Sequence, residues 1–196
     1  MRDPLVDAED DAATPLTPEE RKDLIPAFMA ERAHLNEVEQ MGVDAAYQWA
    51  FQRRRDVLDE ALLCRLHHRM FRDVWRWAGQ FRTTPRNIGV EPWRVGPDLH
   101  QLIGDTRYQA EHGSLAPDEI AVRFHRRLVW IHPFPNGNGR LSRLAADLLI
   151  TRLGQPRFTW GSGNLIATAQ VRKRYIEALR SADREVIEPL LEFARS

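Results

Sequence analysis

The stretch that decides the fold is Ile131-His132-Pro133-Phe134-Pro135-Asn136-Gly137-Asn138-Gly139-Arg140-Leu141-Ser142-Arg143, which lies between two helical patterns. Its histidine can accept a proton near neutral pH, and Gly137 and Gly139 let backbone N–H groups come close to a phosphate. We expect the helix that begins near Arg140 to point its positive dipole end at the same spot, with Arg140 and Arg143 on one face. These features predict an anion-binding loop suited to nucleotide chemistry.

Two plainer interpretations of this loop are disfavoured. Asn-Gly pairs are common in hairpin turns, but both flanks of Asn136-Gly137-Asn138-Gly139 have helical rather than alternating periodicity. The stretch is also no Walker loop, because no Gly-Lys-Ser/Thr follows it and no strand precedes it. A metallohydrolase is weakly supported, since no HExxH-like spacing relates the other histidines considered, which are His67, His68, His100, His112 and His125.

Composition limits the class of protein. The chain has 196 residues, 43% of them hydrophobic, which is enough for one well-buried domain. The 28 basic and 28 acidic residues cancel, so we expect neither a nucleic acid nor a membrane surface as partner. Cys64, the single cysteine, excludes an internal disulfide. With no signal-peptide pattern and no run of about 20 apolar residues, we expect a cytoplasmic protein.

The chain divides into a flexible N-terminal segment, residues 1–16, and a single helical domain, residues 17–196, with N-terminal helices over 17–52 and a core over about 55–196. Residues 1–16 are acidic and lack periodicity. Thr17-Pro18-Glu19-Glu20 is typical of a helix start, and this helix should break before Pro26. A second helical pattern, over about 28–51, is interrupted near Gly42.

The core is predicted to be all-α with one short β-hairpin flap. Leu58 to Trp77 has the spacing of a long amphipathic helix that ends at Gly79. Residues 80–96 instead favour an extended hairpin. Further helices are expected from Pro97, from Pro117 to the histidine of the loop, after the loop, from Thr168, and over 185–193 with a disturbance at Pro189.

The loop resembles the signature of the Fic family, His-x-Phe-x-(Asp/Glu)-Gly-Asn-Gly-Arg-x-x-Arg, which lies between two helices of an all-α bundle. The matching residues are His132, Phe134, Gly137, Asn138, Gly139, Arg140 and Arg143. The resemblance extends from Trp75-Arg76-Trp77-Ala78-Gly79 to Tyr175-Ile176-Glu177-Ala178-Leu179. The chain is also similar to the branch labelled mobile mystery protein B, through Ala13-Thr14-Pro15-Leu16-Thr17, Leu24-Ile25-Pro26 and Leu35-Asn36-Glu37.

This resemblance implies a protein adenylyltransferase, which moves AMP from ATP to a Tyr, Thr or Ser hydroxyl of a target protein, itself included, with Mg²⁺ or Mn²⁺ on the phosphates. His132 would take the hydroxyl proton. The N–H groups of Gly137 to Gly139, with Asn138, would bind the α- and β-phosphates, and Arg140 and Arg143 the β/γ end. The protein substrate would dock on the flap by strand-like pairing with Ile88, Gly89 and Val90.

Asn136 departs from the family signature, which has an acidic metal ligand at this position. An amide oxygen lacks the charge of a carboxylate and should bind Mg²⁺ more weakly. We expect active but metal-weakened transfer. The alternatives are a nucleotide-binding interaction module with little turnover and a transferase of another phosphate-containing group, as in the Doc branch, although that branch departs from the Gly-Asn-Gly-Arg run that is intact here.

Many Fic proteins carry an inhibitory (Ser/Thr)-x-x-x-Glu-(Gly/Asn) helix whose glutamate pairs with the second signature arginine, here Arg143. Two glutamates could play this role in cis. Glu39 lies in a suitable N-terminal place without the flanking residues of the motif, and Glu185 follows Ser181 at the right spacing but precedes Val186. An ordinary solvated glutamate is the alternative for each.

Overall fold

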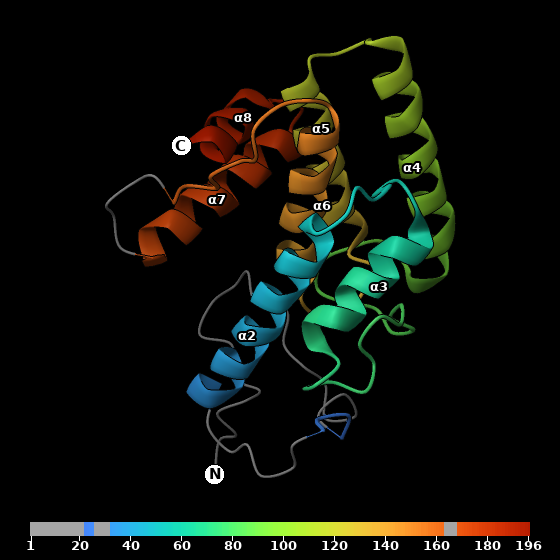
Figure 1. The fold of residues 1–196 in the computed structure, drawn as a ribbon, viewed down its shortest axis with the longest axis vertical. Coiled ribbons are helices and arrows are strands. Elements are labelled where there is room, and N and C mark those ends of the chain that lie inside the picture. Colours follow the sequence, from blue (N-terminus) through green and yellow to red (C-terminus); the bar gives the residue numbers. More distant parts are fainter. Residues whose placement is uncertain (1–21, 26–31, 163–167) are drawn as a thin grey trace.

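The computed structural model describes residues 22–25, 32–162 and 168–196 (Figure 1). The elements are α2 (Arg32–Phe51), α3 (Glu60–Phe71), the 3₁₀ helix η1 (Pro92–Arg94), α4 (Val95–His112), α5 (Pro117–Ile131), α6 (Asn138–Arg152), α7 (Thr168–Asp183) and α8 (Glu188–Arg195). The described residues form no sheet, which confirms the all-α fold class. The predicted flexible segment, residues 1–16, and the start of the first helix lie outside the described residues.

α5 and α6 form the centre of the bundle, and the remaining helices pack around them (Figure 1). Pro117 occupies the first turn of α5, as predicted, and α4 ends at Gly113, which has a φ of 59°. α6 is apolar on most of its circumference and is buried along its length through Leu141, Leu144, Ala145, Leu148 and Leu149. The loop of interest connects these two core helices, so the core fixes both of its ends.

α2 runs unbroken from Arg32 to Phe51, so the interruption predicted near Gly42 is wrong. A Cβ atom at Gly42 would lie 2.2 Å from the carbonyl oxygen of Met70 on α3. The glycine therefore allows two helices to approach closely and does not break its own helix, although it has a lower helix propensity than alanine.

The helix predicted over Leu58 to Trp77 is shorter than expected, because α3 ends at Phe71. The residues after Phe71 form turns, which are bonded through the backbone to residues 23–25. Leu24 and Trp75 make an isolated antiparallel bridge, with Ile25 N–H donating to Val74 O at 2.8 Å. Residues 22–25 belong to this bridge and a turn, so the helix predicted from Thr17 does not extend through them.

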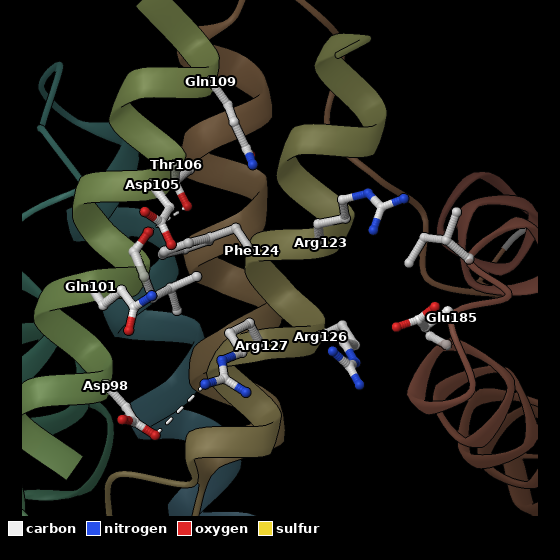
Figure 2. A pocket seen from close by; sticks show the side chains of 13 residues that line it. Asp98, Gln101, Asp105, Thr106, Gln109, Arg123, Phe124, Arg126, Arg127 and Glu185 are labelled. Carbon is white, nitrogen blue, oxygen red and sulfur yellow. Dashed lines mark hydrogen bonds and ion pairs between the residues drawn. The ribbon is translucent and has the colours of Figure 1, made fainter. Parts of the chain in front are cut away.

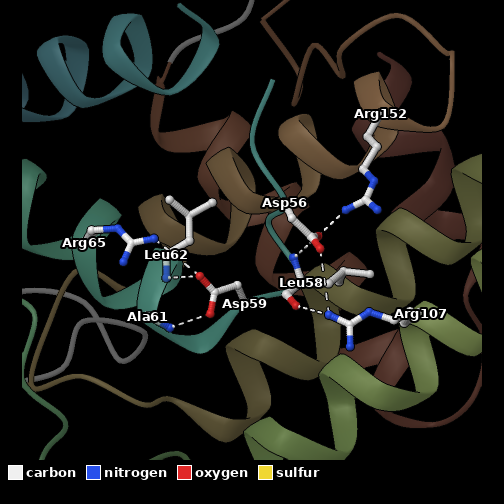
Figure 3. A network of polar contacts seen from close by, with 8 residues as sticks. All are labelled: Asp56, Leu58, Asp59, Ala61, Leu62, Arg65, Arg107 and Arg152. Carbon is white, nitrogen blue, oxygen red and sulfur yellow. Dashed lines mark hydrogen bonds and ion pairs between the residues drawn. The ribbon is translucent and has the colours of Figure 1, made fainter. Parts of the chain in front are cut away.

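The connection between α2 and α3 is fixed by two aspartates (Figure 3). Asp59 caps α3 and accepts hydrogen bonds from the N–H groups of Ala61 and Leu62, each at 3.1 Å. Asp56 pairs with Arg152 at the C-terminal end of α6 and lies 3.8 Å from Arg107 of α4. These contacts join α3, α4 and α6 at the end of the bundle opposite to the start of α6.

Residues 80–91 form an irregular loop that leads into η1 and α4, so the β-hairpin predicted over 80–96 is wrong. The backbone N–H groups of its two arms donate to another part of the chain. Arg82 N–H donates to Pro133 O at 3.0 Å, and Val90 N–H donates to Ile131 O at 3.4 Å. The Arg82 side chain also donates to the carbonyl of Val90, which takes the place of a cross-strand hydrogen bond. We keep the name flap for residues 80–91.

Two helix starts also differ from prediction. α4 begins at Val95, directly after η1, and not at Pro97. α8 begins at Glu188, with Pro189 in its first turn. Proline is tolerated there because an N–H group in the first turn has no acceptor within the helix. Glu185, the predicted start, lies before α8 with a φ of 69°. None of the described helices combines the length and apolarity that crossing a membrane requires.

Candidate active site

His132 is the residue at which α5 ends. Its backbone is left-handed, with φ 53° and ψ 60°, and its N–H donates to Leu128 O at 3.2 Å. A side chain in this region is uncommon and strained, so the surrounding contacts must hold it. Arg82 does so, because its Nε donates to His132 O at 2.6 Å. The histidine predicted to be the base therefore sits at a turn that the flap fixes.

The imidazole of His132 is held in its neutral form. Burial lowers its pKa to about 4, and the positive charges of Arg82 and Arg86 act in the same direction, while the carbonyl of Val129 opposes them. Nδ1 lies 3.4 Å from Val129 O, and a carbonyl can only accept. Nδ1 therefore carries the hydrogen, which leaves the lone pair on Nε2.

Gly89 brings the flap against this histidine. Its φ is 104°, and a Cβ atom there would lie 2.6 Å from Cβ of His132 and 2.9 Å from Nη2 of Arg82. Of the three predicted docking residues, Ile88 is exposed, whereas Val90 uses both its N–H and its carbonyl in hydrogen bonds to Ile131 and Arg82. A docking segment would therefore meet Ile88 and Gly89 before Val90.

The start of α6 has the geometry of an anion-binding site. Gly137 precedes the helix with a φ of 77°, and no side chain caps this end. The N–H groups of the first turn, from Asn138, Gly139 and Arg140, have no acceptor within the helix. A Cβ atom at Gly137 would lie 2.3 Å from the Phe71 ring, so only glycine fits there. These N–H groups and the positive end of the helix dipole together make the start of α6 a place that can bind phosphate.

The Asn138 side chain serves the loop. Its Oδ1 accepts from Phe134 N–H at 3.0 Å, and its Nδ2 donates to Phe134 O at 2.8 Å. Phe134 is fully buried, which fits the anchoring role expected of it. Because the amide of Asn138 is used at both ends, its contribution to phosphate binding would come from its backbone N–H.

Asn136 is turned toward its own loop. Its Oδ1 accepts from Gly137 N–H at 2.6 Å, and its carbonyl lies 3.0 Å from Nε2 of His67. Among the described residues, no group of three or more His, Cys, Asp or Glu side chains could hold a metal ion. The donor set around the loop thus contains one neutral oxygen and does not fit a dedicated divalent metal site.

Glu39 of α2 reaches the start of α6. Its Oε2 lies 2.7 Å from Nη1 of Arg140, and its Oε1 accepts from Trp75 Nε1 at 2.6 Å. Glu39 is 5% exposed. The expected glutamate–arginine pair is therefore present, but it involves the first signature arginine and not Arg143, which was predicted as the partner.

Arg143 lies over an aromatic ring of α7. Its Cζ is 5.4 Å from the centroid of Tyr175, whose hydroxyl lies 3.2 Å from Nε2 of the buried His125. Burial raises the pKa of Tyr175 and lowers that of His125 to about 3, so both are neutral at physiological pH. The Arg143 guanidinium also makes a side-chain hydrogen bond with Tyr175, so α7 holds this arginine beside the start of α6.

Glu185 does not meet Arg143. It is exposed in the turn after α7 and lines a cavity of about 520 Å³ between α4, α5 and that turn, where Figure 2 shows it opposite Arg126. Arg143 does not line this cavity. Arg143 contacts the ring of Tyr175, which lies about 12 Å along the helix axis before the end of α7, at 1.5 Å per residue. Glu185 lies beyond that end. Of the two predicted glutamates, Glu39 therefore contacts a signature arginine and Glu185 does not.

Sequence reasoning missed three residues that support the loop, namely His67, His125 and Tyr175. The two histidines were considered as metal ligands and as ordinary surface or core residues, and Tyr175 only as part of a helix. One signal was available for the histidines, since each occupies a buried position within an apolar helical pattern, where a polar side chain requires hydrogen-bond partners.

Comparison with known proteins places this site in a family. Residues 57–150 match the Fic/DOC family. The chain is 32% identical over 165 residues to "Protein adenylyltransferase Fic" of Culex quinquefasciatus, a match that covers 78% of this chain and 31% of that protein. The chain thus spans less than a third of the length of this relative.

Two solved structures have the same fold. Fic-1 from C. elegans has a TM-score of 0.68 and 25% identity, covering 90% of this chain and 52% of that one. BepC from Bartonella tribocorum, solved with bound AMPPNP, has a TM-score of 0.69 and 18% identity, covering 91% of this chain and 97% of that one. With the loop and its two helices in place, the chain belongs to the Fic/DOC family through the domain that includes residues 57–150.

Proposed function

We propose that this chain is a protein adenylyltransferase that moves AMP from ATP to a Tyr, Thr or Ser hydroxyl of a target protein, itself included. One observation carries the proposal. A neutral histidine at the end of α5 and the uncapped N-terminus of α6, with its two arginines, are joined by one short buried loop. This arrangement supplies a base and a phosphate site side by side, and the adenylyltransferase relatives support the assignment.

His132 acts as the general base. Nε2 takes the proton of the target hydroxyl, and the hydroxyl oxygen attacks the α-phosphorus of ATP. The bond between the α-phosphorus and the oxygen that bridges to the β-phosphate breaks, and pyrophosphate leaves. A positioned base of this kind contributes roughly 10²- to 10⁴-fold to the rate.

The start of α6 holds the triphosphate. The N–H groups of Asn138, Gly139 and Arg140 donate to phosphate oxygens, and Arg143 stabilises the charge that develops on pyrophosphate. Arg140 can join them only after leaving Glu39, from which it lies 2.7 Å. We therefore propose that α2 inhibits the site in cis, and that nucleotide binding competes with the Glu39 carboxylate for Arg140.

The divalent ion, Mg²⁺ or Mn²⁺, enters this proposal with ATP. When bound to the phosphates it neutralises their charge. The residues of the loop do not fit a metal site of their own, since Asn136 supplies one uncharged oxygen that already accepts a hydrogen bond. Every step assigned to the protein therefore uses the backbone donors, the two arginines and His132.

The protein substrate is proposed to lie along the flap. Ile88 is 42% exposed, and Gly89 contacts His132 closely enough that the flap and the base form one surface. An extended segment paired with residues 88–89 would bring its hydroxyl toward the imidazole.

The place where this protein acts is proposed to be the cytoplasm. Subcellular fractionation of the native host would test this.

The experiment compares the wild-type protein with His132→Ala. Both are incubated with Mg²⁺ and ATP that carries a fluorescent adenine, alone and with a lysate, and calorimetry measures binding of a non-hydrolysable ATP analogue. We expect label on protein only with the wild type, and equal nucleotide affinity for both. Equal labelling by the variant would contradict the role of the histidine, and binding without any labelling would favour a nucleotide-binding module.

A further inference from the structure

We propose that His67 is a positioning residue, which fixes the peptide between Asn136 and Gly137 so that the start of α6 presents its N–H groups to a phosphate. This inference rests on the proposed function, because the orientation of that peptide matters to catalysis only if the loop binds a nucleotide. His67 belongs to α3 and is fully buried. It touches no reacting atom, so it acts only through the loop.

Both ring nitrogens of His67 are hydrogen-bonded to backbone. Gly79 N–H donates to Nδ1 at 2.9 Å, and Nε2 lies 3.0 Å from Asn136 O. A backbone N–H can only donate and a carbonyl can only accept, so Nδ1 is the acceptor and Nε2 carries the hydrogen. One side chain thus links the turn that follows α3 to the catalytic loop, and its tautomer is fixed by both partners.

The ring face of His67 holds the loop at a second point. It stacks on Phe134 with the ring centroids 3.8 Å apart and the planes 6° apart. Phe134 is itself held at both backbone polar groups by Asn138. His67 therefore contacts the loop on either side of Pro135, through stacking at Phe134 and through a hydrogen bond at Asn136.

The hydrogen bond to Asn136 fixes a peptide plane. The carbonyl of Asn136 and the N–H of Gly137 belong to the same planar unit. The carbonyl accepts from His67, and the N–H donates to Asn136 Oδ1 at 2.6 Å. Gly137 is the residue that precedes α6, with a φ of 77°. Rotation of this plane would change the direction from which the chain enters the helix, and with it the aim of the first-turn donors.

This role requires a neutral ring. Burial lowers the pKa of His67 to about 3, and the charges of Arg140 and His68 act in the same direction, against the hydrogen bond to Asn136. A proton on Nδ1 would face the N–H of Gly79 and break that contact. At physiological pH the ring therefore keeps one donor and one acceptor, as the two backbone partners need.

Two substitutions separate the loop contact from the others. In His67→Gln the side-chain N–H₂ can reach the place of Nε2 and donate to Asn136 O, while the acceptor for Gly79 is lost. In His67→Asn the shorter amide can accept from Gly79, while the donor to Asn136 is lost. Both variants lose the ring stack equally. They therefore differ mainly in the hydrogen bond that the proposal concerns.

The measurements are hydrogen exchange of the amides at 136–140, affinity for a non-hydrolysable ATP analogue, and kcat and KM of labelling. We expect His67→Asn to exchange faster in this segment and to lose about 10- to 100-fold in kcat, with His67→Gln within about threefold of wild type, since a buried acceptor left without its donor is costly. His68→Gln is the control. Its ring bonds Ala78 O at 3.0 Å in the same turn, so the loop should be unaffected.

Equal effects of the two His67 variants, or a larger effect of His67→Gln, would overturn the proposal, because a merely structural histidine has no reason to favour the longer amide. Hydrogen exchange and analogue binding need no turnover. If the wild type transfers no AMP, the proposed function fails while these two readouts still decide whether His67 orients the loop.

Discussion

Replacing Glu39 with glutamine should strengthen ATP binding. Glu39 holds Arg140 through a contact of 2.7 Å and accepts from Trp75 Nε1 at 2.6 Å. Glutamine has nearly the same shape, and its Oε1 can still accept from the indole. The substitution therefore removes the charge that competes with phosphate for Arg140 and leaves the packing of α2 in place.

The magnitude follows from the environment of the pair. A hydrogen bond to a charged group contributes about 1.5–3 kcal/mol when it is buried. The Glu39 side chain is 7% exposed, but that of Arg140 is 26% exposed, so we use the lower end of this range. About 1.5 kcal/mol corresponds to roughly a tenfold decrease in Kd for ATP. The same loss should lower the free energy of unfolding by about 1–2 kcal/mol.

Isothermal titration calorimetry with a non-hydrolysable ATP analogue measures this Kd. Glu37→Gln, on the exposed face of the same helix, is the matched control and should bind like the wild type. In a double-mutant cycle, Arg140→Gln should cancel the gain of Glu39→Gln, whereas Arg143→Gln should not. An unchanged Kd for Glu39→Gln, or a gain that depends on Arg143, would refute the assignment of this pair.

Four further predictions test the site and its support. Because burial lowers the pKa of His132 to about 4, the neutral base is present above that pH, and kcat/KM from a pH series should stay flat from neutral pH to about pH 5 and fall below it. Gly137→Ala should lower the free energy of unfolding by about 2–4 kcal/mol in urea titrations, through its φ of 77° and a clash with a core ring. Gly113→Ala, with a φ of 59° and open space around it, should cost about 1–2 kcal/mol. Burial lowers the pKa values of His67 and His125 to about 3, so below about pH 6.5 these rings bind protons only when the chain is unfolded. The stability that the two rings contribute is therefore complete above that pH and should fall by roughly 4 kcal/mol from pH 7 to pH 5. A pH-independent urea midpoint would contradict the burial of these two rings.

The parts of the fold that local pattern decides were predictable. α5 and α6 have apolar residues at helical spacing and clear starts, and both lie where the sequence indicates. The errors occurred where a distant segment decides the local structure. α3 stops at Phe71 because the following turns bond to residues near Leu24, and Gly42 stays helical because its missing side chain makes room for α3.

The flap shows the same limit. Its β-branched residues predict a hairpin, but the Arg82 side chain donates to the carbonyls of Thr84 and Val90 and ties the flap to the loop that holds His132. A hydrogen bond across 50 positions leaves no periodic signal in the sequence. The same holds for the site, where the motif identified the base and the donors, while the contacts of Glu39 with Arg140 and of His67 with the loop became visible only in three dimensions.

The most direct test of the central claim is the position of the transferred label. The protein is incubated with Mg²⁺ and ATP radiolabelled on the α-phosphorus, in parallel with ATP labelled on the γ-phosphorus, with and without a lysate, and His132→Ala serves as the control. Transfer of AMP predicts that protein acquires the α-label, does not acquire the γ-label, and acquires neither with the variant. Labelling from the γ-phosphorus, or α-labelling that persists in His132→Ala, would contradict this account.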